Sequence, residues 1–387
     1  MKRIKVILLS ILILWGNTIF AQTSSVPHLG DSAFASVLTC GPGDEFYTTF
    51  GHSAIRICDP QQHIDVVYNY GVFNFDVPHF YWKFAKGYLN YRIDRASFAS
   101  FMMEYQYEGR AVWEQKLNIT NQELNNMFVF LEWNNLPENR YYQYDFFKDN
   151  CATRVRDVVS NSLIHRSAFT NQEIETNESF RDILYQSTEE NLLWWRFGID
   201  MVLGVRCDKK TTAMEQMFSP NLMMYQLDTL TLSDCGQPLV ESHQQILQET
   251  RTPLHRSISP TVTFWCLFVV VLSFTIIGWV KNWNLKRMDI IIFVVIGLMS
   301  ILIMFLWFFS QHYCTKVNLN LLWCSPLFLY FAIRLRKSNR VVIAIQMMLL
   351  ILTIAGSWFL PQQFNEAVIP IALLLFVRLL DKFRLIK

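Results

Sequence analysis

Two residues in the first half of the chain have the types and settings that thiol chemistry needs. His52 follows Gly51 at the head of the alternating run 54–57, which is typical of a half-buried strand. Cys151 follows Asn150 where a polar turn changes into a helical pattern. The free backbone N–H groups and the dipole at a helix N-terminus stabilise a thiolate, lower the thiol pKa and can serve as an oxyanion hole. We therefore expect a Cys151 nucleophile with His52 as its base; the alternative is a core histidine and a core cysteine.

These two residues need a sheet that faces the start of a helix. The histidine precedes the cysteine, the reverse of the order in papain, which favours a circularly permuted papain-like arrangement of the NlpC type. The runs 52–57 and 65–75 predict a hairpin that turns about residues 59–61, and helical patterns follow at 121–133 and after residue 151. We therefore expect the soluble part to be α+β.

A third polar group should orient the imidazole. The hairpin brings Asn69 back opposite His52, and we expect the Asn69 side chain to hold the imidazole ring. The alternative is a polar residue that merely ends the second strand. His63 lies nearer the turn, where we expect an exposed loop.

Long stretches without charge in the last third of the chain predict a membrane domain. Residues 261–280, 290–309 and 341–360 are each long enough to cross ~30 Å of hydrocarbon. The shorter runs 319–333 and 364–380 are weaker candidates. We expect all of these runs to span, which gives a transmembrane bundle of about five helices.

The amino end and the distribution of basic residues predict the orientation. Residues 1–21 combine a basic start with an apolar core and are expected to form a secretory signal peptide, with an uncleaved anchor as the alternative. Residues 22–260 would then be an exported catalytic domain, and residues 261–387 the transmembrane domain. In that orientation the inner segments carry eleven basic residues and the outer loops carry only Lys316. The positive-inside rule then predicts a multi-pass membrane protein with a cytoplasmic C-terminus.

Charge and cysteine content narrow the choice of partners. Residues 22–260 hold 19 Lys and Arg against 29 Asp and Glu, and this acidic balance argues against nucleic acid. No set of His, Cys and carboxylate residues has the spacing of metal ligands, so we expect neither a metal nor another cofactor.

Five of the eight cysteines lie in the soluble part, which leaves at least one thiol free or paired with another chain. Cys207 and Cys235 are either a disulfide or two buried free thiols.

The predicted outer loop 310–326 places polar residues at the mouth of the helix bundle. His312 and Asn320 are either ordinary polar residues of the membrane interface or part of a lipid site. Together with Asn150, they are our candidates for substrate or lipid binding.

Five ordered motifs resemble the Lnb family of Bacteroidota lipoprotein N-acyltransferases, in which a periplasmic domain is joined to a transmembrane domain. The motifs are LTCGPGDEFYTTFGHSAIRI, VYNYGVFNFDVPHFYWKFAKG, YYQYDFFKDNCATRVRD, DKKTTAMEQMFSP and VNLNLLWCSPL. The family's domain looks related to permuted papain-like acyltransferases, which have a histidine ahead of an Asn-Cys pair. The matching positions in this chain are His52 and Cys151.

The resemblance implies acyl transfer at the outer face of the inner membrane. Cys151 would take an acyl chain from a phospholipid as a thioester and pass it to the α-amino group of diacylglyceryl-cysteine in a lipoprotein. The expected partners are therefore a phospholipid donor and a diacylated lipoprotein acceptor. Two alternatives stay open. The first is a thiol hydrolase that uses the same pair of residues, and within it we rank a deacylase above a cell-wall peptidase. The second is a non-enzymatic lipid or lipoprotein receptor.

Overall fold

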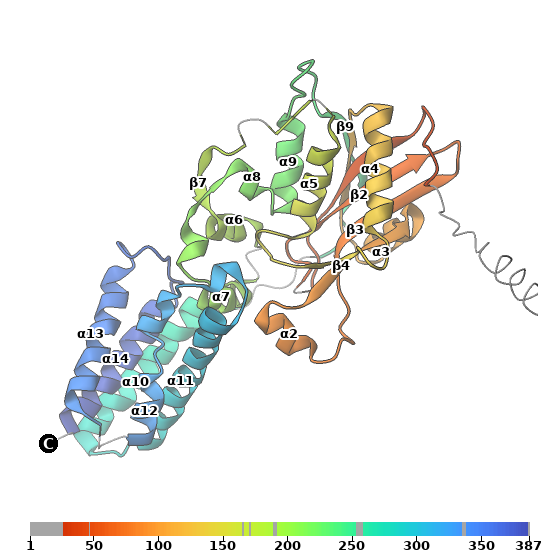
Figure 1. Ribbon diagram of the computed structural model, residues 1–387. Helices are drawn as coiled ribbons and strands as arrows, with labels where there is room; N and C mark the ends of the chain where they lie inside the picture. The colour runs from red at the N-terminus through yellow and green to blue at the C-terminus, as the bar shows by residue number, and fades with distance from the viewer. Residues whose placement is uncertain are drawn as a thin grey trace, which may run out of the picture.

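The computed structural model describes residues 26–45, 47–164, 166–169, 172–188, 192–252, 258–334 and 338–385. An antiparallel sheet with helices on both faces is joined to a bundle of long helices (Figure 1). The C-terminus lies at the end of the bundle that is far from the sheet. This architecture confirms the expected α+β unit followed by a helical membrane region. The predicted signal peptide, residues 1–21, lies outside the described residues.

The sheet places the candidate histidine near its centre. Among the described residues, seven strands pair in the order β6-β4-β3-β2-β1-β5-β9, and each pair is antiparallel. The strands are β1 (Phe34–Cys40), β2 (His52–Asp59), β3 (Ile64–Val72), β4 (Asn90–Ser97), β5 (Val112–Leu117), β6 (Tyr141–Gln143) and β9 (Val240–Leu247). The predicted hairpin is confirmed as β2 and β3. Its second strand ends at Val72 rather than at residue 75, just after its register with β4 shifts.

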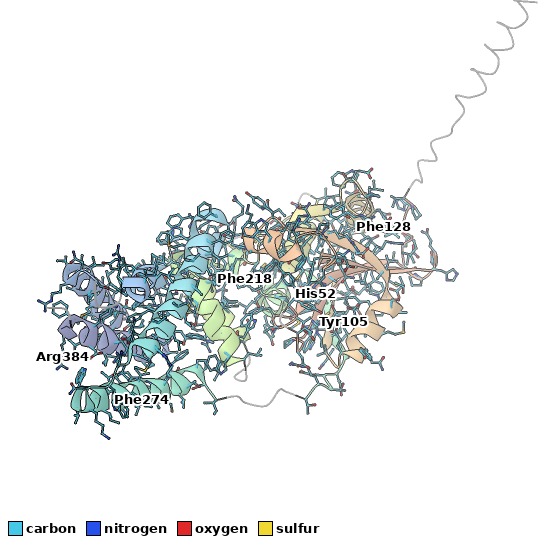
Figure 2. The ribbon with its side chains drawn as sticks, turned by 90° about the horizontal axis from the view of Figure 1, so that it is seen from below. His52, Tyr105, Phe128, Phe218, Phe274 and Arg384 are labelled. Atoms are coloured by element: carbon cyan, nitrogen blue, oxygen red, sulfur yellow. The ribbon has the colours of Figure 1, made fainter. Side chains whose placement is uncertain are left out.

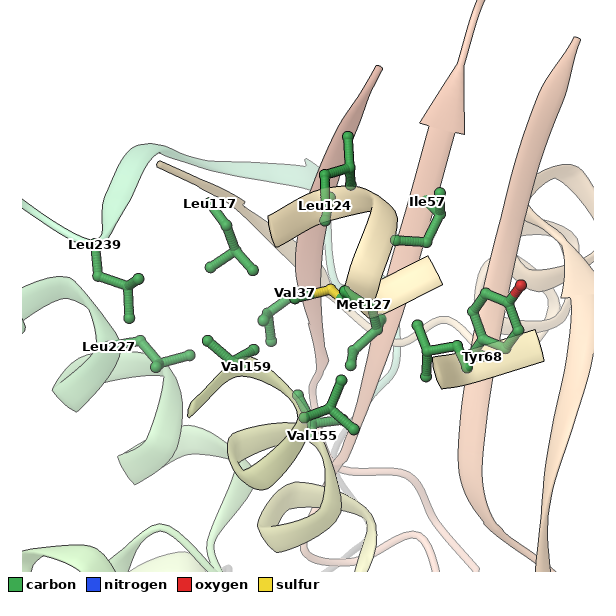
Figure 3. Close-up of a cluster of buried hydrophobic side chains, with 14 of the residues drawn as sticks. Val37, Ile57, Tyr68, Leu117, Leu124, Met127, Val155, Val159, Leu227 and Leu239 are labelled. Carbon is green, nitrogen blue, oxygen red and sulfur yellow. The ribbon is translucent and has the colours of Figure 1, made fainter. Parts of the chain in front are cut away.

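Side chains that alternate along the strands are buried on both faces of the sheet. On one face, α4 (Asn121–Asn134), α5 (Cys151–Ser162) and α9 (Pro220–Thr229) contribute to the main hydrophobic core. Figure 3 shows Val37 and Ile57 of the strands close to Met127 of α4 and Val155 of α5. On the opposite face, strand residues pack with α3 (Phe98–Tyr107). The predicted helices at 121–133 and after residue 151 are therefore confirmed, and α5 is fixed to the sheet by its apolar side.

The bundle contains five helices within residues 258–334 and 338–385. They are α10 (Pro260–Lys281), α11 (Lys286–Phe309), α12 (Leu327–Arg334), α13 (Arg340–Gly356) and α14 (Val368–Leu385). Two short 3₁₀ turns, η2 (Tyr313–Thr315) and η3 (Leu319–Leu322), connect α11 to α12.

The number of membrane spans is smaller than predicted when helix length and apolar composition are the criteria. In the described part of the chain, α10 and α11 are long and apolar enough to cross a membrane. A third span is counted if the pair Tyr313–Leu322 and Leu327–Arg334, which is bent by 41°, crosses as one unit. Pro326 lies at this break and has no N–H for a continuous helix. The helix α13 has 17 residues, and α14 carries charged residues in its second half, Arg378 among them. The five-span prediction is therefore not confirmed.

One helix that precedes the bundle in the chain packs into it. Phe197 and Met201 of α7 (Leu193–Val202) belong to the same hydrophobic cluster as the membrane helices, and the Phe197 ring centroid lies 5.3 Å from that of Phe264 in α10. The buried Asp200 in α7 pairs with Arg181 at 2.6 Å and accepts a hydrogen bond from Asn365 at 2.7 Å. Near this junction lie β7 (Glu175–Ser179), α6 (Phe180–Ser187), η1 (Val205–Asp208), β8 (Lys210–Thr212) and α8 (Ala213–Gln216).

For the cysteine pair, the disulfide alternative is wrong and the alternative of two buried free thiols is right only for Cys207. Cys207 and Cys235 are free thiols, so they form no disulfide in this structure. Cys207 is buried, as the second alternative requires, but Cys235 is exposed. The buried Cys207 packs in one cluster with Cys314 from the outer loop. Cys207 therefore lies at the junction between the two parts of the chain.

Candidate active site

Cys151 is the first residue of α5, as the sequence predicts. The side chain of Asn150 caps the helix by accepting a hydrogen bond from the Thr153 N–H at 2.9 Å, and the Asn150 N–H donates to Thr153 Oγ1 at 2.8 Å. The amide of Asn150 also donates to the carbonyl oxygens of Phe146 and Phe218. Asn150 is thus buried with both ends of its side chain bonded within the protein. It fixes the start of the helix, and its contact with a substrate stays a prediction.

The Cys151 thiol lies at the end of β2 that carries His52. The backbone N–H groups of Ser53, Ala152 and Cys151 itself are within hydrogen-bonding reach of the sulfur. Ser53 directly follows His52 in β2. Gly71 of β3 has φ +87°, which favours glycine, and a Cβ built on it would lie at the ordinary contact distance of 3.6 Å from the Cys151 Cβ, so β3 borders the start of α5.

His52 is half-buried and its ring is held by the predicted orienting residue. His52 Nε2 lies 3.2 Å from Asn69 Oδ1, which fits an Nε2–H donor and leaves Nδ1 free to accept a proton. Gly51 before it has φ +80°, and a Cβ there would approach the Cys40 carbonyl oxygen to 2.5 Å. Only glycine therefore suits the entry to the strand. Among the described hydrogen bonds, none joins His52 to the Cys151 thiol, a feature that is common in unliganded sites.

The electrostatics contradict the lowered pKa that the start of the helix predicts for the Cys151 thiol. Burial raises the pKa of the Cys151 thiol above its ordinary value, although the backbone N–H groups and the charge of Arg110 oppose this effect. Burial also lowers the pKa of His52 to about 4, and the charge of Arg110 acts in the same direction. The resting pair is therefore a neutral thiol and a neutral imidazole rather than an ion pair. Such a pair can still react by transferring the proton as the sulfur attacks.

Sequence reasoning missed Arg110, a buried cation beside this pair. Arg110 is 3% exposed, its Nε donates to the Gly41 carbonyl oxygen at 2.8 Å, and its Nη1 donates to Glu108 at 2.8 Å. Gly41 follows Cys40, the residue paired with His52 across β1 and β2. Within the described part of the chain, Arg110 Nη2 is buried without a hydrogen-bond partner. The signal in the sequence was an arginine directly before the short apolar run 111–113.

Arg110 gives a prediction for the reactivity of the thiol. We expect Arg110→Gln to raise the thiol pKa further and to slow alkylation of Cys151 near neutral pH, because a positive charge that favours the thiolate is lost. The rate of alkylation by iodoacetamide would be measured against pH by mass spectrometry. Arg110→Lys keeps the charge and is the matched control. A Gln variant with the wild-type pH profile would show that Arg110 does not act on the thiol.

A pocket of about 400 Å³ lies between the sheet domain and the outer loop of the bundle. Its lining residues are Gly87, Gln143, Tyr144, Asp145, Asp149, Gln311 and His312. Tyr144 also lies 3.9 Å from the Cβ position of Gly71, next to Cys151. The inner wall of the pocket is therefore about one side chain away from the thiol.

The two candidate residues of the outer loop have different surroundings. His312 lines the pocket, and its Nε2 lies 2.8 Å from the Phe84 carbonyl oxygen. Asn320 is buried; its amide donates to the Asp200 carbonyl oxygen at 2.8 Å, and its oxygen accepts from the Trp323 indole at 2.9 Å. The structure therefore brings His312 to the pocket, whereas it places Asn320 at the junction with α7.

Figure 2 shows that His52 lies well away from the far end of the bundle, which is marked by Arg384.

Two family descriptions match the chain. The Lnb N-terminal periplasmic domain matches residues 30–184, and the Lnb transmembrane domain matches residues 252–387. The first match contains His52, Asn69, Arg110 and Cys151, and the second contains the bundle from its first helix. No curated protein and no solved structure matches the chain.

Proposed function

The chain belongs to the Lnb family, since it carries the family's periplasmic and transmembrane domains in order, and from this premise we propose that it N-acylates lipoproteins. It moves an acyl chain from a phospholipid to the α-amino group of diacylglyceryl-cysteine. The observation that carries the proposal is the Cys151 thiol at the start of α5, beside the backbone N–H of Ser53 and at the His52 end of β2. A helical membrane domain suits this reaction, because both substrates are anchored in lipid.

The first half-reaction acylates the enzyme. His52 Nδ1 accepts the thiol proton as the sulfur attacks the ester carbonyl carbon of the phospholipid. The negative charge that develops on the carbonyl oxygen is stabilised by backbone N–H groups at the start of α5 and at Ser53. The tetrahedral intermediate collapses by breaking the bond to the glycerol oxygen, and His52 returns the proton to that oxygen. Lysophospholipid leaves and a thioester remains on Cys151.

The second half-reaction transfers the acyl chain to the acceptor. The neutral α-amino group of the diacylated lipoprotein attacks the thioester carbon, and His52 accepts the proton that the nitrogen loses. The C–S bond breaks, and the sulfur takes the proton back from His52. The products are an amide on the lipoprotein and the free thiol. Asn69 holds the imidazole in one orientation through both steps, and Arg110 favours negative charge near the sulfur.

The proposal includes a fold relationship and a topology. A cysteine-bearing helix packed on an antiparallel sheet, with the histidine on an earlier strand, supports a permuted papain-like arrangement of the NlpC type. We further propose that α10 to α14 all cross the inner membrane, with α12 and its preceding 3₁₀ turns as a broken span. The catalytic domain, residues 22–260, then lies in the periplasm and the C-terminus in the cytoplasm.

The topology leads to a prediction with reporter fusions. A reporter that is active only in the cytoplasm should be active when it is fused after Lys387 and inactive when it is inserted at Trp358, which is exposed in the turn after α13. A reporter that is active only in the periplasm should give the opposite pattern. Equal activity of one reporter at both positions would remove α14 from the set of spanning helices.

The reaction is tested with purified protein, phospholipid and a short diacylglyceryl-cysteine peptide. Mass spectrometry should detect triacylated peptide and lysophospholipid in equal amounts. Omission of the peptide should leave one acyl group on Cys151. Release of fatty acid at the same rate with and without the peptide would instead show a deacylase. If no acyl-enzyme forms and neither transfer nor hydrolysis is detected, the result would favour a lipid or lipoprotein receptor.

A further inference from the structure

The short helix α2 (Phe80–Lys86) exposes several large aromatic side chains. Tyr81 is 80% exposed, Trp82 55% and Phe84 43%. Phe80 of the same helix is buried, and its ring is stacked with that of Phe73 with the centroids 5.9 Å apart. Phe80 therefore anchors the helix to the sheet domain, and a hydrogen bond from the Gln143 amide to the Gly87 carbonyl oxygen holds its C-terminal end. An apolar surface of this kind marks a contact with another molecule or with lipid.

The position of α2 beside the bundle identifies what this surface faces. The ring of Trp82 lies 5.2 Å from the ring of Phe305, which is on α11 one turn before the helix ends at Phe309. Four residues of helix correspond to about 6 Å, so Trp82 lies close to the depth at which α11 leaves the hydrocarbon. Figure 1 shows α2 alongside the end of the bundle that is nearest to the sheet.

Backbone contacts fix this position. The Gln311 N–H donates to the Lys86 carbonyl oxygen at 2.8 Å, and the His312 ring nitrogen lies 2.8 Å from the Phe84 carbonyl oxygen. Gly87, directly after α2, packs against Gln311 and lines the 400 Å³ pocket. The exposed aromatic surface therefore adjoins the pocket, whose inner wall is about one side chain away from the thiol.

The composition of α2 matches that of interfacial helices. Tryptophan and tyrosine prefer the boundary between hydrocarbon and water, and lysine side chains reach from that depth to lipid phosphates. Lys83 and Lys86 lie in the last turn of α2, and the Lys86 Nζ lies 4.8 Å from the Trp82 ring centroid. On the adjoining helix α11, Phe308 and Phe309 are also exposed, so the apolar surface includes the end of that helix.

We propose that α2 lies in the outer leaflet of the bilayer and binds phospholipid at the mouth of the pocket. The occupant is the lipid surface itself, with acyl chains against the aromatic side chains and phosphates near the lysines. Delivery of the bound lipid to Cys151 rests on the proposed acyltransferase function, whereas binding of α2 to the leaflet is independent of that function.

Photochemical cross-linking tests where α2 lies. Benzoylphenylalanine in place of Tyr81 would be irradiated in the full-length protein in nanodiscs of phosphatidylethanolamine and phosphatidylglycerol. We expect lipid adducts at position 81, detected by mass spectrometry. The matched control is position 107, because Tyr107 is 94% exposed on α3, farther from the bundle. No excess of adduct at position 81 over position 107 would overturn the proposal.

A charged variant tests whether the surface serves lipid delivery. We expect Tyr81→Asp to lower transfer from a bilayer phospholipid by about tenfold, and to leave transfer from a monomeric short-chain phospholipid unchanged. Tyr107→Asp should alter neither. Equal loss with both donors would show a structural defect instead and overturn the delivery role. If position 81 cross-links to lipid but the wild-type protein forms no triacylated peptide, the lipid surface stands and the acyltransferase function is ruled out.

Discussion

Replacement of Cys151 by serine is expected to abolish acyl transfer, with a loss of about 10⁴-fold or more in turnover. The hydroxyl keeps the position of the nucleophile, but it holds its proton far more strongly than a thiol does. A neutral His52 with a pKa of about 4 is too weak a base to remove that proton. The acyl-enzyme of the peptide-free reaction should disappear as well, which intact-protein mass spectrometry would detect.

The control for this variant is Cys58→Ser. Cys58 is a buried cysteine of β2, the strand that carries His52, and it lies near the opposite end of that strand. It is paired with Phe34 of β1. Its replacement tests the effect of a new hydroxyl in the sheet without touching the site. Full activity of Cys151→Ser would assign the nucleophile to another residue and would end the proposed mechanism.

Replacement of His52 by alanine is expected to lower kcat/KM by about 10²- to 10⁴-fold, the usual contribution of a general base. The wild-type profile carries a second signature. Because burial lowers the pKa of His52 to about 4, the neutral base persists in mild acid, and kcat/KM should fall only as the pH approaches 4. An unperturbed histidine would lose activity near pH 6.5. The measurement is kcat/KM against pH with a donor whose own ionisation does not change in that range.

His63→Asn is the matched control, since His63 is exposed in the turn that follows β2 and has a positive φ that asparagine tolerates. It should leave the rate and the profile unchanged. Asn69→Ala should cost up to about tenfold in a protein with His52, the value of one neutral hydrogen bond. The same change should cost little in the His52→Ala background. An acid limb near pH 6.5 in the wild type would contradict the buried, neutral imidazole.

The local elements of the site could be predicted because their signals are short-range. Alternation in 52–57 and the Asp-Pro-Gln turn specify the hairpin, and the hairpin register places Asn69 within reach of His52. The cap at Asn150 likewise depends on residues next to it in the chain. The exposed His63 is also confirmed by the structure.

Features that depend on contacts between distant segments could not be predicted. Burial of the site reverses the expected pKa of Cys151, and burial depends on how α5 and α3 cover the two faces of the sheet. Arg110 reaches the site because β5 pairs with β1, a neighbour that no local pattern indicates. The count of spans differs for another reason, since α13 is only 17 residues long and α14 carries charged residues in its second half.

The packing of α7 into the bundle determines the order in which the protein can be completed during synthesis. The chain leaves the ribosome from its N-terminus, so α7 is exported before α10 to α14 exist. Until those helices insert, Phe197 and Met201 have no bundle to pack against, and Asp200 lacks its hydrogen bond from Asn365. Assembly of the part that precedes the bundle therefore ends only after the last membrane helices are made. A protein that stops before residue 261 would expose this helix to chaperones and proteases.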